Sequence, residues 1–518
     1  MKLSLLLAAL IGLCSAAAAA PGGPAFNVRD YGAVPDGSTK STAAIARAVA
    51  ACSAAGGGTV HFPAGRYLTG SIQLESNITL DLDAGAVLLY SPDPADSPLV
   101  PSRWECTNAW IHAPLIYANG KENIAIVGRG TLNGQGENWW WRNGKTPARA
   151  AEAKPAHDAW LRLYDRIEAG EKTTAKDFEF AAEYLRPTLI EAYGCRNVLI
   201  DGVTVTNSPF WILHPLYCEN VVVRGVSFIS WGPNGDGIDV DSCRDVRISD
   251  CFFTTGDDCI VIKSGRDADG RRTARPTEHV AITNCVMYKG HGAIVIGSET
   301  SGDIRNVVAS NIVAKGTDRG IRIKSMYGRG GVVENVRCDN FVIEDALVEA
   351  IEVTTSYEGK SAPQPVSEKT PIFRNFSFSN LTIVNARRVA SIDGLAEKAI
   401  ENLRFTDICA TGTSGFMCSA VNSIELHSVR VDATNGGAFC FEQVRGLVLD
   451  QVTTRTPQTA SPVVRLADVD GIWIQGCQAA AGTKTFLQVD GGVPRHLKLS
   501  GNDLSEAANP VLPADISH

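Results

Sequence analysis

Short segments in which apolar and polar residues alternate recur along most of the chain. Alternation with a period of two, rich in Val and Ile, predicts half-buried β-strands, and the Asn, Asp and Gly residues beside each segment predict turns. The clearest copies read RNVLIDGVTV, ENVVVRGVSF, RDVRISDCFF, EHVAITNCVM, RNVVASNIVA, ENVRCDNFVI, RNFSFSNLTI and ENLRFTDICA. This region shows no segments of helical period, so the pattern favours an all-β fold.

The spacing of the copies predicts how the strands are connected. One apolar residue marks the same phase in each copy: Val198, Val221, Val246, Val280, Val307, Val336, Phe376 and Leu403. Weaker copies follow at Ile424, Leu447, Ile472 and Leu497, with spacings of 21 to 25 residues. Such a period is typical of stacked parallel β-coils, in which longer spacings carry loop insertions. We therefore predict a single right-handed parallel β-helix, since a leucine-rich template is missing and propeller blades need about 40 residues each.

The N-terminal part predicts a cover for the open end of this solenoid. Apolar residues at helical spacing stand behind two candidate helix caps, Ser41 and Thr42: Ile45, Ala48, Val49 and Cys52. We expect a short capping helix there, and a loop insertion at about 137–182, where helix-forming residues interrupt the strand pattern. One domain is predicted over 21–518, with catalytic coils at about 230–360 and additional coils at about 370–510.

The first residues have the composition of a secretory signal peptide. Lys2 precedes an apolar stretch from Leu3 to Leu13, and small residues follow up to Ala20. We predict a signal peptide over 1–20 and a secreted or periplasmic protein. No later segment approaches 18 uninterrupted apolar residues, so we expect neither a membrane anchor nor a membrane partner.

Charge and cysteine content narrow the possible partners. A net charge of -8 argues against nucleic acid, and recognition of an acidic polymer would need a local basic patch. Removal of the signal peptide would leave 13 of the 14 cysteines, an odd number. Several occupy core positions of predicted strands, as Cys251 and Cys285 do, so we expect buried free thiols, with disulfides as the alternative. We expect a monomer, because coil stacking buries the core internally.

Two acidic motifs lie one coil apart, PNGDGIDVDS and TTGDDCIVIKSG. Asp257 and Asp258 follow Asp236 by 21 and 22 residues, which predicts that the three carboxyl groups share one surface. Like charges in this position resist joint ionisation, so one carboxyl group should keep its proton. Glycosidic hydrolysis needs this pair of states, an acid for the leaving oxygen and a base for water. Taken singly, each aspartate would be interpreted as a turn residue.

The following coils add an imidazole and two cations to the same surface. His291 lies in GHGAIVIGSE, 33 residues after Asp258, and Arg322 and Lys324 follow in GIRIKSMYGRGG. Because the two cations alternate with Ile, both side chains point to one face of a strand. Turn capping does not predict this combination of residues.

These motifs resemble glycoside hydrolase family 28, the polygalacturonase family. The family signatures run Asn-Thr-Asp, Gly-Asp-Asp, Gly-His-Gly and Arg-Ile-Lys. The chain reads Asn234-Gly235-Asp236, Gly256-Asp257-Asp258, Gly290-His291-Gly292 and Arg322-Ile323-Lys324, in the same order. The similarity covers roughly residues 26–357, and the later coils match in style alone.

The resemblance implies an inverting hydrolase of α-1,4-galacturonosidic bonds in pectin, polygalacturonate or oligogalacturonides. Asp257 would be the general acid, Asp236 and Asp258 would activate water, and His291 would keep the acid protonated. The implied substrate-binding residues are Arg322 and Lys324, which would hold the uronate, together with Asn234, Tyr357 and Lys263. Hydrolysis by carboxylates requires no cofactor and no metal, and no Cys/His spacing matches a zinc template.

Two features depart from simple expectation. Gly235 replaces the family threonine, whose hydroxyl group could orient the neighbouring aspartate. Carboxylates one coil apart would also lie nearer the ~5 Å separation associated with retention than the wider gap usual for inversion. The resemblance decides for inversion.

A basic cluster between Asp258 and His291 bears on substrate and mode of action. Its members are Lys263, Arg266, Arg271, Arg272 and Arg275, and we expect them to give the cleft lip a positive potential. GHGAIVIGSE and the large insertions resemble bacterial members that act on chain ends, which favours exo action. The alternatives are a rhamnogalacturonan or xylogalacturonan hydrolase, a calcium-dependent pectate lyase, and a non-catalytic glycan-binding β-helix of the adhesin or tailspike type.

Overall fold

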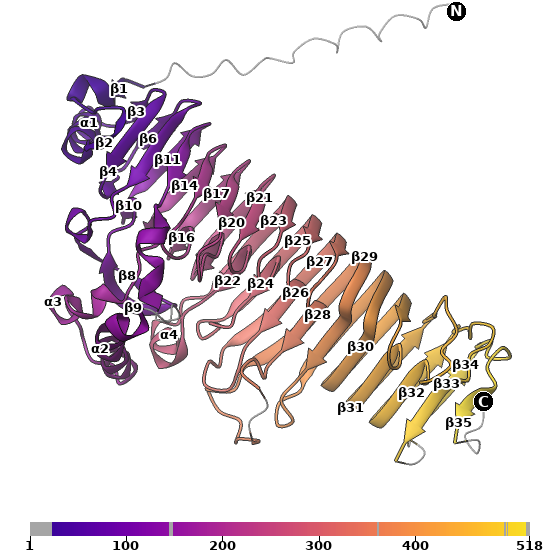
Figure 1. Ribbon diagram of the computed structural model, residues 1–518. Helices are drawn as coiled ribbons and strands as arrows, with labels where there is room; N and C mark the ends of the chain where they lie inside the picture. The colour runs from indigo at the N-terminus through magenta and orange to yellow at the C-terminus, as the bar shows by residue number, and fades with distance from the viewer. Residues whose placement is uncertain (1–22, 144–148, 360–361, 492–493, 495, 514–518) are drawn as a thin grey trace, which may run out of the picture.

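The computed structural model describes residues 23–143, 149–359, 362–491, 494 and 496–513. The predicted signal peptide, 1–20, lies outside the described residues. Strands stack in parallel along one long axis, with the N-terminal and C-terminal coils at opposite ends (Figure 1). The prediction of a right-handed parallel β-helix is confirmed.

The strands form three parallel ladders that run along the axis. The first ladder contains β1(Ala25–Asn27), β3(Gly58–Phe62), β6(Ile78–Leu82), β11(Glu122–Gly128), β14(Arg196–Asp201), β17(Glu219–Arg224), β20(Arg244–Ser249), β23(Thr277–Tyr288), β25(Ile304–Lys315), β27(Val332–Glu344) and β34(Leu497–Ser500). The second contains β2(Asp36–Lys40), β4(Gly65–Thr69), β7(Ala86–Tyr90), β12(Thr131–Asn133), β15(Thr204–Thr206), β18(Ser227–Ser230) and β21(Phe252–Thr255).

The third ladder carries the predicted catalytic motifs. It contains β5(Ile72–Gln73), β10(Ile116–Asn119), β13(Ile190–Tyr193), β16(Leu213–Leu216), β19(Ile238–Asp241), β22(Ile260–Lys263), β24(Ile294–Ile296), β26(Arg319–Lys324), β28(Glu349–Thr354), β33(Thr485–Asp490) and β35(Asn509–Leu512). Four long strands contribute to both the first and the third ladder: β29(Ile372–Asp393), β30(Ile400–Ala433), β31(Phe439–Asp450) and β32(Val464–Gln475). Because they link both ladders, the third ladder continues without a break beyond β28.

The repeat read from the sequence is the stacking register of the first ladder. The phase-marking residues from Val198 to Leu403 pair one to one along consecutive strands. The weaker copies pair in the same way, Ile424 with Leu447, Leu447 with Ile472 and Ile472 with Leu497. A shift by one residue would turn every apolar side chain outward, so burial fixes this register.

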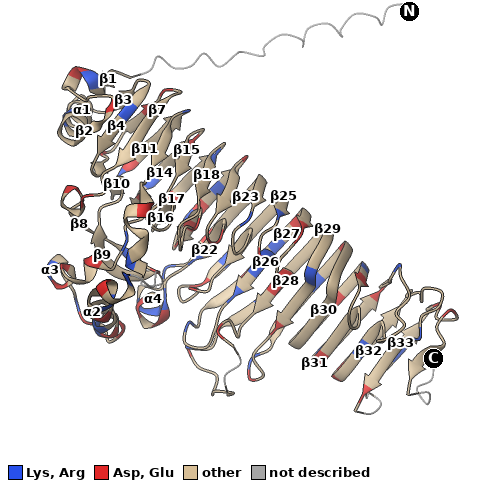
Figure 2. Cartoon of the chain, viewed as in Figure 1, with Lys and Arg blue, Asp and Glu red and all other residues tan. Residues whose placement is uncertain are grey.

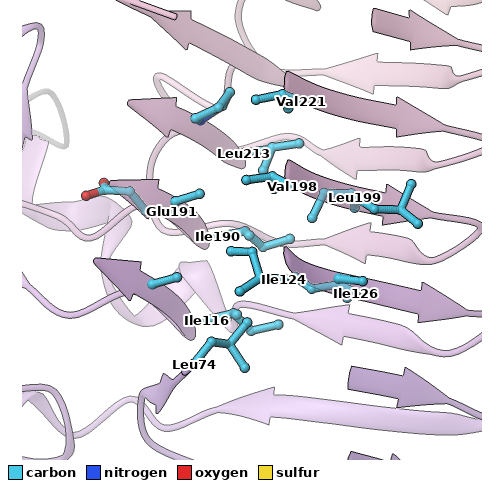
Figure 3. A pocket seen from close by; sticks show the side chains of 15 residues that line it. Leu74, Ile116, Ile124, Ile126, Ile190, Glu191, Val198, Leu199, Leu213 and Val221 are labelled. Carbon is cyan, nitrogen blue, oxygen red and sulfur yellow. The ribbon is translucent and has the colours of Figure 1, made fainter. Parts of the chain in front are cut away.

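Apolar side chains fill the interior of the coils. Figure 3 shows Ile116, Ile190 and Leu213 of the third ladder facing Ile124 and Val198 of the first. The remaining space there is about 10 Å³, at the lower limit for one water molecule. Glu191, next to Ile190, points away from this cluster (Figure 3), so the acidic side chain belongs to the outer face.

The open N-terminal end is covered by the predicted helix, α1(Thr42–Ala54). Its apolar face packs on the first coils through Ile45, Ala48, Val49 and Cys52, which are all buried. This prediction is confirmed. Without this helix, the first coil would expose its apolar interior side chains to water.

Insertions gather beside the N-terminal half of the third ladder (Figure 1). They comprise the antiparallel hairpin β8(Leu99–Trp104) and β9(Thr107–His112), and the helices α2(Ala150–Glu168), α3(Ala175–Phe178) and α4(Asp267–Thr273). Short 3-10 turns accompany the coils and insertions: η1(Val28–Tyr31), η2(Pro94–Asp96), η3(Gly136–Asn138), η4(Trp140–Asn143) and η6(Ala181–Glu183). The insertions share a second apolar core, formed around Trp104, Trp160, Phe178 and Phe210.

The cysteines support the coils as core residues. All 13 cysteines of the described residues are free thiols, and all but Cys409 and Cys440 are buried. The prediction of buried free thiols is confirmed for the pair Cys251 and Cys285. Within the part of the chain that the structure describes, no helix has the length and apolar character needed to span a membrane.

Candidate active site

The register of the third ladder brings the three predicted aspartates together. Ile238 pairs with Ile260, and Ile260 pairs with Ile294, which places Asp236 opposite Asp258 and Asp257 opposite His291. One carboxylate oxygen from each of Asp236, Asp257 and Asp258 lies within 4.8 Å of the other two. The coil spacing therefore produces the carboxylate cluster.

The carboxyl groups of the cluster have different proton affinities. Burial, with the nearby charges of Asp239 and Asp257, raises the pKa of Asp236 well above its usual value. Burial acts in the same direction on Asp257, but the hydrogen bond and positive charge of His291 outweigh it, so the pKa of Asp257 is lowered. In the free protein, the proton therefore belongs to Asp236 and to the pair formed by Asp257 and His291.

His291 contacts Asp257 from the next coil. Its Nδ1 lies 3.0 Å from Asp257 Oδ1, and the imidazole remains half exposed. This contact raises the pKa of His291. A protonated imidazole can therefore donate a hydrogen bond to the carboxylate and supply it with a proton.

Two cations hold the third carboxylate. Lys324 Nζ lies 2.9 Å from Asp258 Oδ2, and Arg322 Nη1 lies 3.8 Å from Asp258 Oδ1. Arg322 also donates from Nε to Glu352 at 2.7 Å. Both cations face the ring of Tyr357, at 5.2 and 5.1 Å from its centroid. The structure thus brings Arg322, Lys324 and Tyr357 to one side of the aspartates.

Asn234 and Gly235 fix the backbone before Asp236. Asn234 has a left-handed backbone (φ 53°), and its side-chain oxygen accepts a hydrogen bond of 2.7 Å from buried Arg186. A side chain at Gly235 would begin 2.7 Å from the carbonyl oxygen of Gly232. The family threonine therefore does not fit this turn, and Arg186 bound to Asn234 anchors the segment instead.

The aspartates lie in a cleft of about 210 Å³. Asn234, Lys263, Lys324 and Tyr357 also line this cleft. Lys263 was predicted to lie in a basic loop, but it ends strand β22, is buried, and pairs with Glu299 at 2.8 Å. Its positive charge is therefore already neutralised within the cleft lining.

The basic cluster as a whole does not form the expected cationic lip. Arg266 lines the cleft but pairs with Glu105 at 2.8 Å. Arg271, Arg272 and Arg275 donate to backbone carbonyl groups of Gly328, Glu168 and Tyr217. The expectation that all five cations serve the cleft is wrong, because backbone oxygens of neighbouring loops bind three of them.

A buried charge network closes the N-terminal side of the cleft. Arg103 of the β8–β9 hairpin donates to Asp241 at 2.9 Å, and both side chains are fully buried. Ser102 of the same strand donates to Glu191 at 2.8 Å, and Glu191 lies 3.1 Å from His214. The outer face of β13, β16 and β19 is therefore covered by the hairpin.

The helices α2 and α4 hold the hairpin β8–β9 in position through hydrogen bonds. The carboxylate of Glu168, at the end of α2, accepts hydrogen bonds from Ala268 and Asp269 in the first turn of α4. Asp269 in turn accepts two hydrogen bonds of 3.0 Å from Asn108 of the hairpin. We call the hairpin β8–β9 with α2 and α4 the wall. Figure 2 shows acidic and basic residues on α2 and α4.

The sequence patterns assign no role to several residues of the site. Arg186 and Trp211 belong to no motif, Glu299 ends the segment GHGAIVIGSE, and long-range contacts place all three around the cleft. A signal was present for Glu191, His214 and Asp239, which follow one another by 23 and 25 residues. This is the same coil spacing that gathers the catalytic aspartates.

Comparison with known proteins adds independent evidence. Residues 180–429 match the model of Glycosyl hydrolases family 28, and residues 25–90 match Rhamnogalacturonase A/epimerase, pectate lyase-like. A probable polygalacturonase from Vitis vinifera is 31% identical over 79% of this chain and 77% of its own length. An exo-poly-alpha-D-galacturonosidase from Dickeya chrysanthemi is 28% identical over 83% and 74%.

A solved structure shows the same likeness. The hyperthermoactive exopolygalacturonase from Thermotoga maritima superimposes with a TM-score of 0.72 at 34% identity, over 79% of this chain and 92% of that one. The likeness therefore extends well beyond the four motifs.

Proposed function

The chain belongs to glycoside hydrolase family 28, and from that premise we propose that it removes galacturonic acid units from the ends of pectic chains. It hydrolyses galacturonosidic bonds and takes a pectic polysaccharide as its substrate. The exo mode, the roles of single residues and the stereochemistry are the proposed parts.

The wall is the observation that carries exo action. Arg103 and Asp241 are fully buried where the hairpin covers β19, so a sugar chain has no path along the third ladder on that side. The cleft of about 210 Å³ ends against Trp211, Glu105 and Arg266. A polymer must therefore enter with its end first, and the open side of the ladder holds the remainder.

We assign the acid role to Asp257, recharged by His291. The imidazole Nδ1, at 3.0 Å, can pass its proton to Asp257 as this carboxyl group protonates the leaving oxygen. Asp258 keeps one oxygen without a hydrogen-bond partner among the described side chains, so this oxygen can accept a proton from the attacking water. Asp236 orients this water from the neighbouring coil.

Recognition of the uronate falls to Arg322 and Lys324, next to the ring of Tyr357. A carboxylate on the substrate replaces part of their contact with Asp258 at 2.9 Å and 3.8 Å. Tyr357 offers an apolar face to the sugar ring beside them. This arrangement requires a free, ionised uronate at the cleavage site.

Inversion is supported by the family and not by the spacing. Carboxylate oxygens within 4.8 Å of one another are closer than the gap of about 6.5 Å or more usual in inverting enzymes. The first-formed anomer, followed by NMR during hydrolysis of a digalacturonide, decides the point. A retained product would contradict our assignment.

The deciding experiment follows product size with time on polygalacturonate and on oligogalacturonides. We expect free galacturonic acid to appear from the outset with little fall in the viscosity of the solution, because the wall lets only the end of a chain enter the cleft. A ladder of intermediate oligomers would show endo action and contradict the proposal.

The same assay separates the competing functions. Release from rhamnogalacturonan or xylogalacturonan alone would assign a different pectic polymer. An unsaturated product that absorbs in the ultraviolet would indicate a lyase, and binding without sugar release would indicate a glycan-binding protein. We further propose an exported monomer, on the predicted signal peptide and the internally buried core.

A further inference from the structure

Two adjoining hollows lie on the third ladder beyond the active site, on its C-terminal side. Their volumes are about 410 and 510 Å³, and both are lined by Met417, Cys440 and Arg465. We call them together the distal trough. Its residues used below are Ser391, Met417, Cys440, Glu442 and Arg465.

The distal trough continues the row of side chains that begins in the catalytic cleft. Arg322 pairs with Glu352, and Glu352 pairs with Ser391 of β29. The row then runs through Met417, Cys440 and Arg465. Five strand steps of about 4.8 Å each separate Arg322 from Arg465, a path of about 24 Å on one continuous face.

This side of the ladder is the open one. Figure 1 shows the helices of the wall beside the N-terminal half, while β30, β31 and β32 carry no inserted helix among the described residues. A polymer whose end lies in the closed cleft must therefore leave across these strands. This step rests on the proposed exo function.

The charges of the distal trough differ from those of the cleft. Arg465 is neutralised by Asp490 at 2.6 Å, and Arg388 at its edge contacts Glu349 at 3.2 Å. Glu442 adds negative charge to the lining and has no ion-pair partner among the described residues. An ionised polygalacturonate chain is repelled here, although Arg322 and Lys324 attract its end.

One large apolar side chain, Met417, is exposed in the distal trough among mostly polar lining residues. Met417 is 40% exposed between Ser391 and Cys440, on a strand face where most outward residues are polar. A polarisable thioether contacts small apolar groups without fixed geometry. Esterified uronates carry no charge and bear an apolar methyl group. They are therefore not repelled by Glu442 and can contact Met417.

We propose that the distal trough binds a methyl-esterified, uncharged stretch of a pectic chain whose ionised end lies in the catalytic cleft. The protein would then select chains with a free uronate at the end and esters some sugars away. The ligand class is thus a partially methyl-esterified galacturonan.

The test reverses one charge in the distal trough. Glu442→Arg replaces the repulsion with an attraction, so kcat/KM on polygalacturonate, divided by kcat/KM on digalacturonide, should rise about fivefold at low salt. Ser391 lies two strand steps, about 10 Å, beyond Arg322, so a digalacturonide bound at the aspartates reaches less of the distal trough than a polymer does. Met417→Asp should lower kcat/KM on a partially methyl-esterified pectin of matched length about fivefold.

Glu179→Arg is the matched control, since it makes the same charge change on an exposed residue just after α3. It should leave all three substrates at the wild-type rate. The proposal would be overturned if the ratio of kcat/KM on polygalacturonate to kcat/KM on digalacturonide were the same in Glu442→Arg and wild type. It would also be overturned by a concentration-dependent dimer in sedimentation that Met417→Asp abolishes, because the distal trough would then be an interface between copies. Wild-type protein inactive on all three substrates would instead contradict the proposed function.

Discussion

At the scale of single residues, the site depends on how three close carboxyl groups share protons. Asp236 holds a proton because it is buried beside other acids, while Asp257 stays ionised against the imidazole of His291. Asp258 is held by Lys324. Asp236 and Asp257 thus take different protonation states, and the difference comes from their burial and their neighbours on adjacent coils.

Replacing the proposed acid should abolish turnover and spare binding. Asp257→Asn keeps the shape of the side chain but cannot donate a proton, so kcat should fall about 1000-fold. His291→Gln should lower kcat about 100-fold. Steady-state kinetics with oligogalacturonides measures both, and calorimetry should show unchanged oligosaccharide binding by Asp257→Asn.

The pH profile tests the link between these two residues. Asp257 raises the pKa of His291, so the wild-type proton persists as pH rises until it is lost at that raised value. In His291→Gln the remaining proton is a carboxyl proton, and the alkaline limb of kcat/KM should move to lower pH. An unchanged limb would show that His291 does not recharge Asp257.

Chelation should leave the activity intact. Three carboxylates within 4.8 Å could bind a divalent cation, but the Lys324 ammonium at 2.9 Å already neutralises one of them. Hydrolysis measured after dialysis against EDTA should therefore equal the untreated rate. A loss restored by calcium would favour the lyase alternative.

At the scale of elements, the hairpin β8–β9 depends on a buried ion network. Arg103 bonds to Asp241 and Ser102 bonds to Glu191, while His214 lies between the two acids. Burial opposes a charged imidazole, but the two carboxylates raise the pKa of His214 to about 9. Protonated His214 thus stabilises the two carboxylates to which Ser102 and Arg103 of the hairpin donate.

This network predicts a pH-dependent stability. The pKa of His214 is raised from about 6.5 in the unfolded chain, so its contribution is complete below pH 6.5 and is lost as pH rises through about 9. The loss amounts to about 3 kcal/mol. Urea unfolding followed from pH 6 to 9.5 should show a falling midpoint, and His214→Gln should flatten this dependence. An equal slope in both proteins would contradict the assignment.

At the scale of the whole molecule, the outer face of the third ladder has three different parts along its length. The wall closes its N-terminal half, the catalytic coils occupy the middle, and the distal trough extends it toward the C-terminus (Figure 1). A solenoid allows this because each coil can change its outer residues without disturbing the stacked interior. The proposed exo action and the proposed preference for esterified chains both depend on this arrangement as a whole.

The sequence by itself determined the coils and the carboxylate cluster of the cleft. Val198, Val221 and Val246 mark strands that pair one to one, and coil spacing brings Asp236 to Asp258. Such features repeat locally, because the stacking of neighbouring coils converts a sequence period into spatial contact. The capping helix α1 was predicted for the same reason, from spacing within a few turns.

Only the tertiary structure determined where the wall packs and which groups the residues of the basic cluster contact. Arg103 and Asp241 are 138 residues apart, and no period links the hairpin to the strand it covers. Arg272 carries the charge expected of a substrate ligand, yet it binds the backbone of α2. The resemblance implied that His291 keeps Asp257 protonated, whereas in the structure the pKa of Asp257 is lowered and that of Asp236 is raised, because burial and charged neighbours from other coils set each pKa.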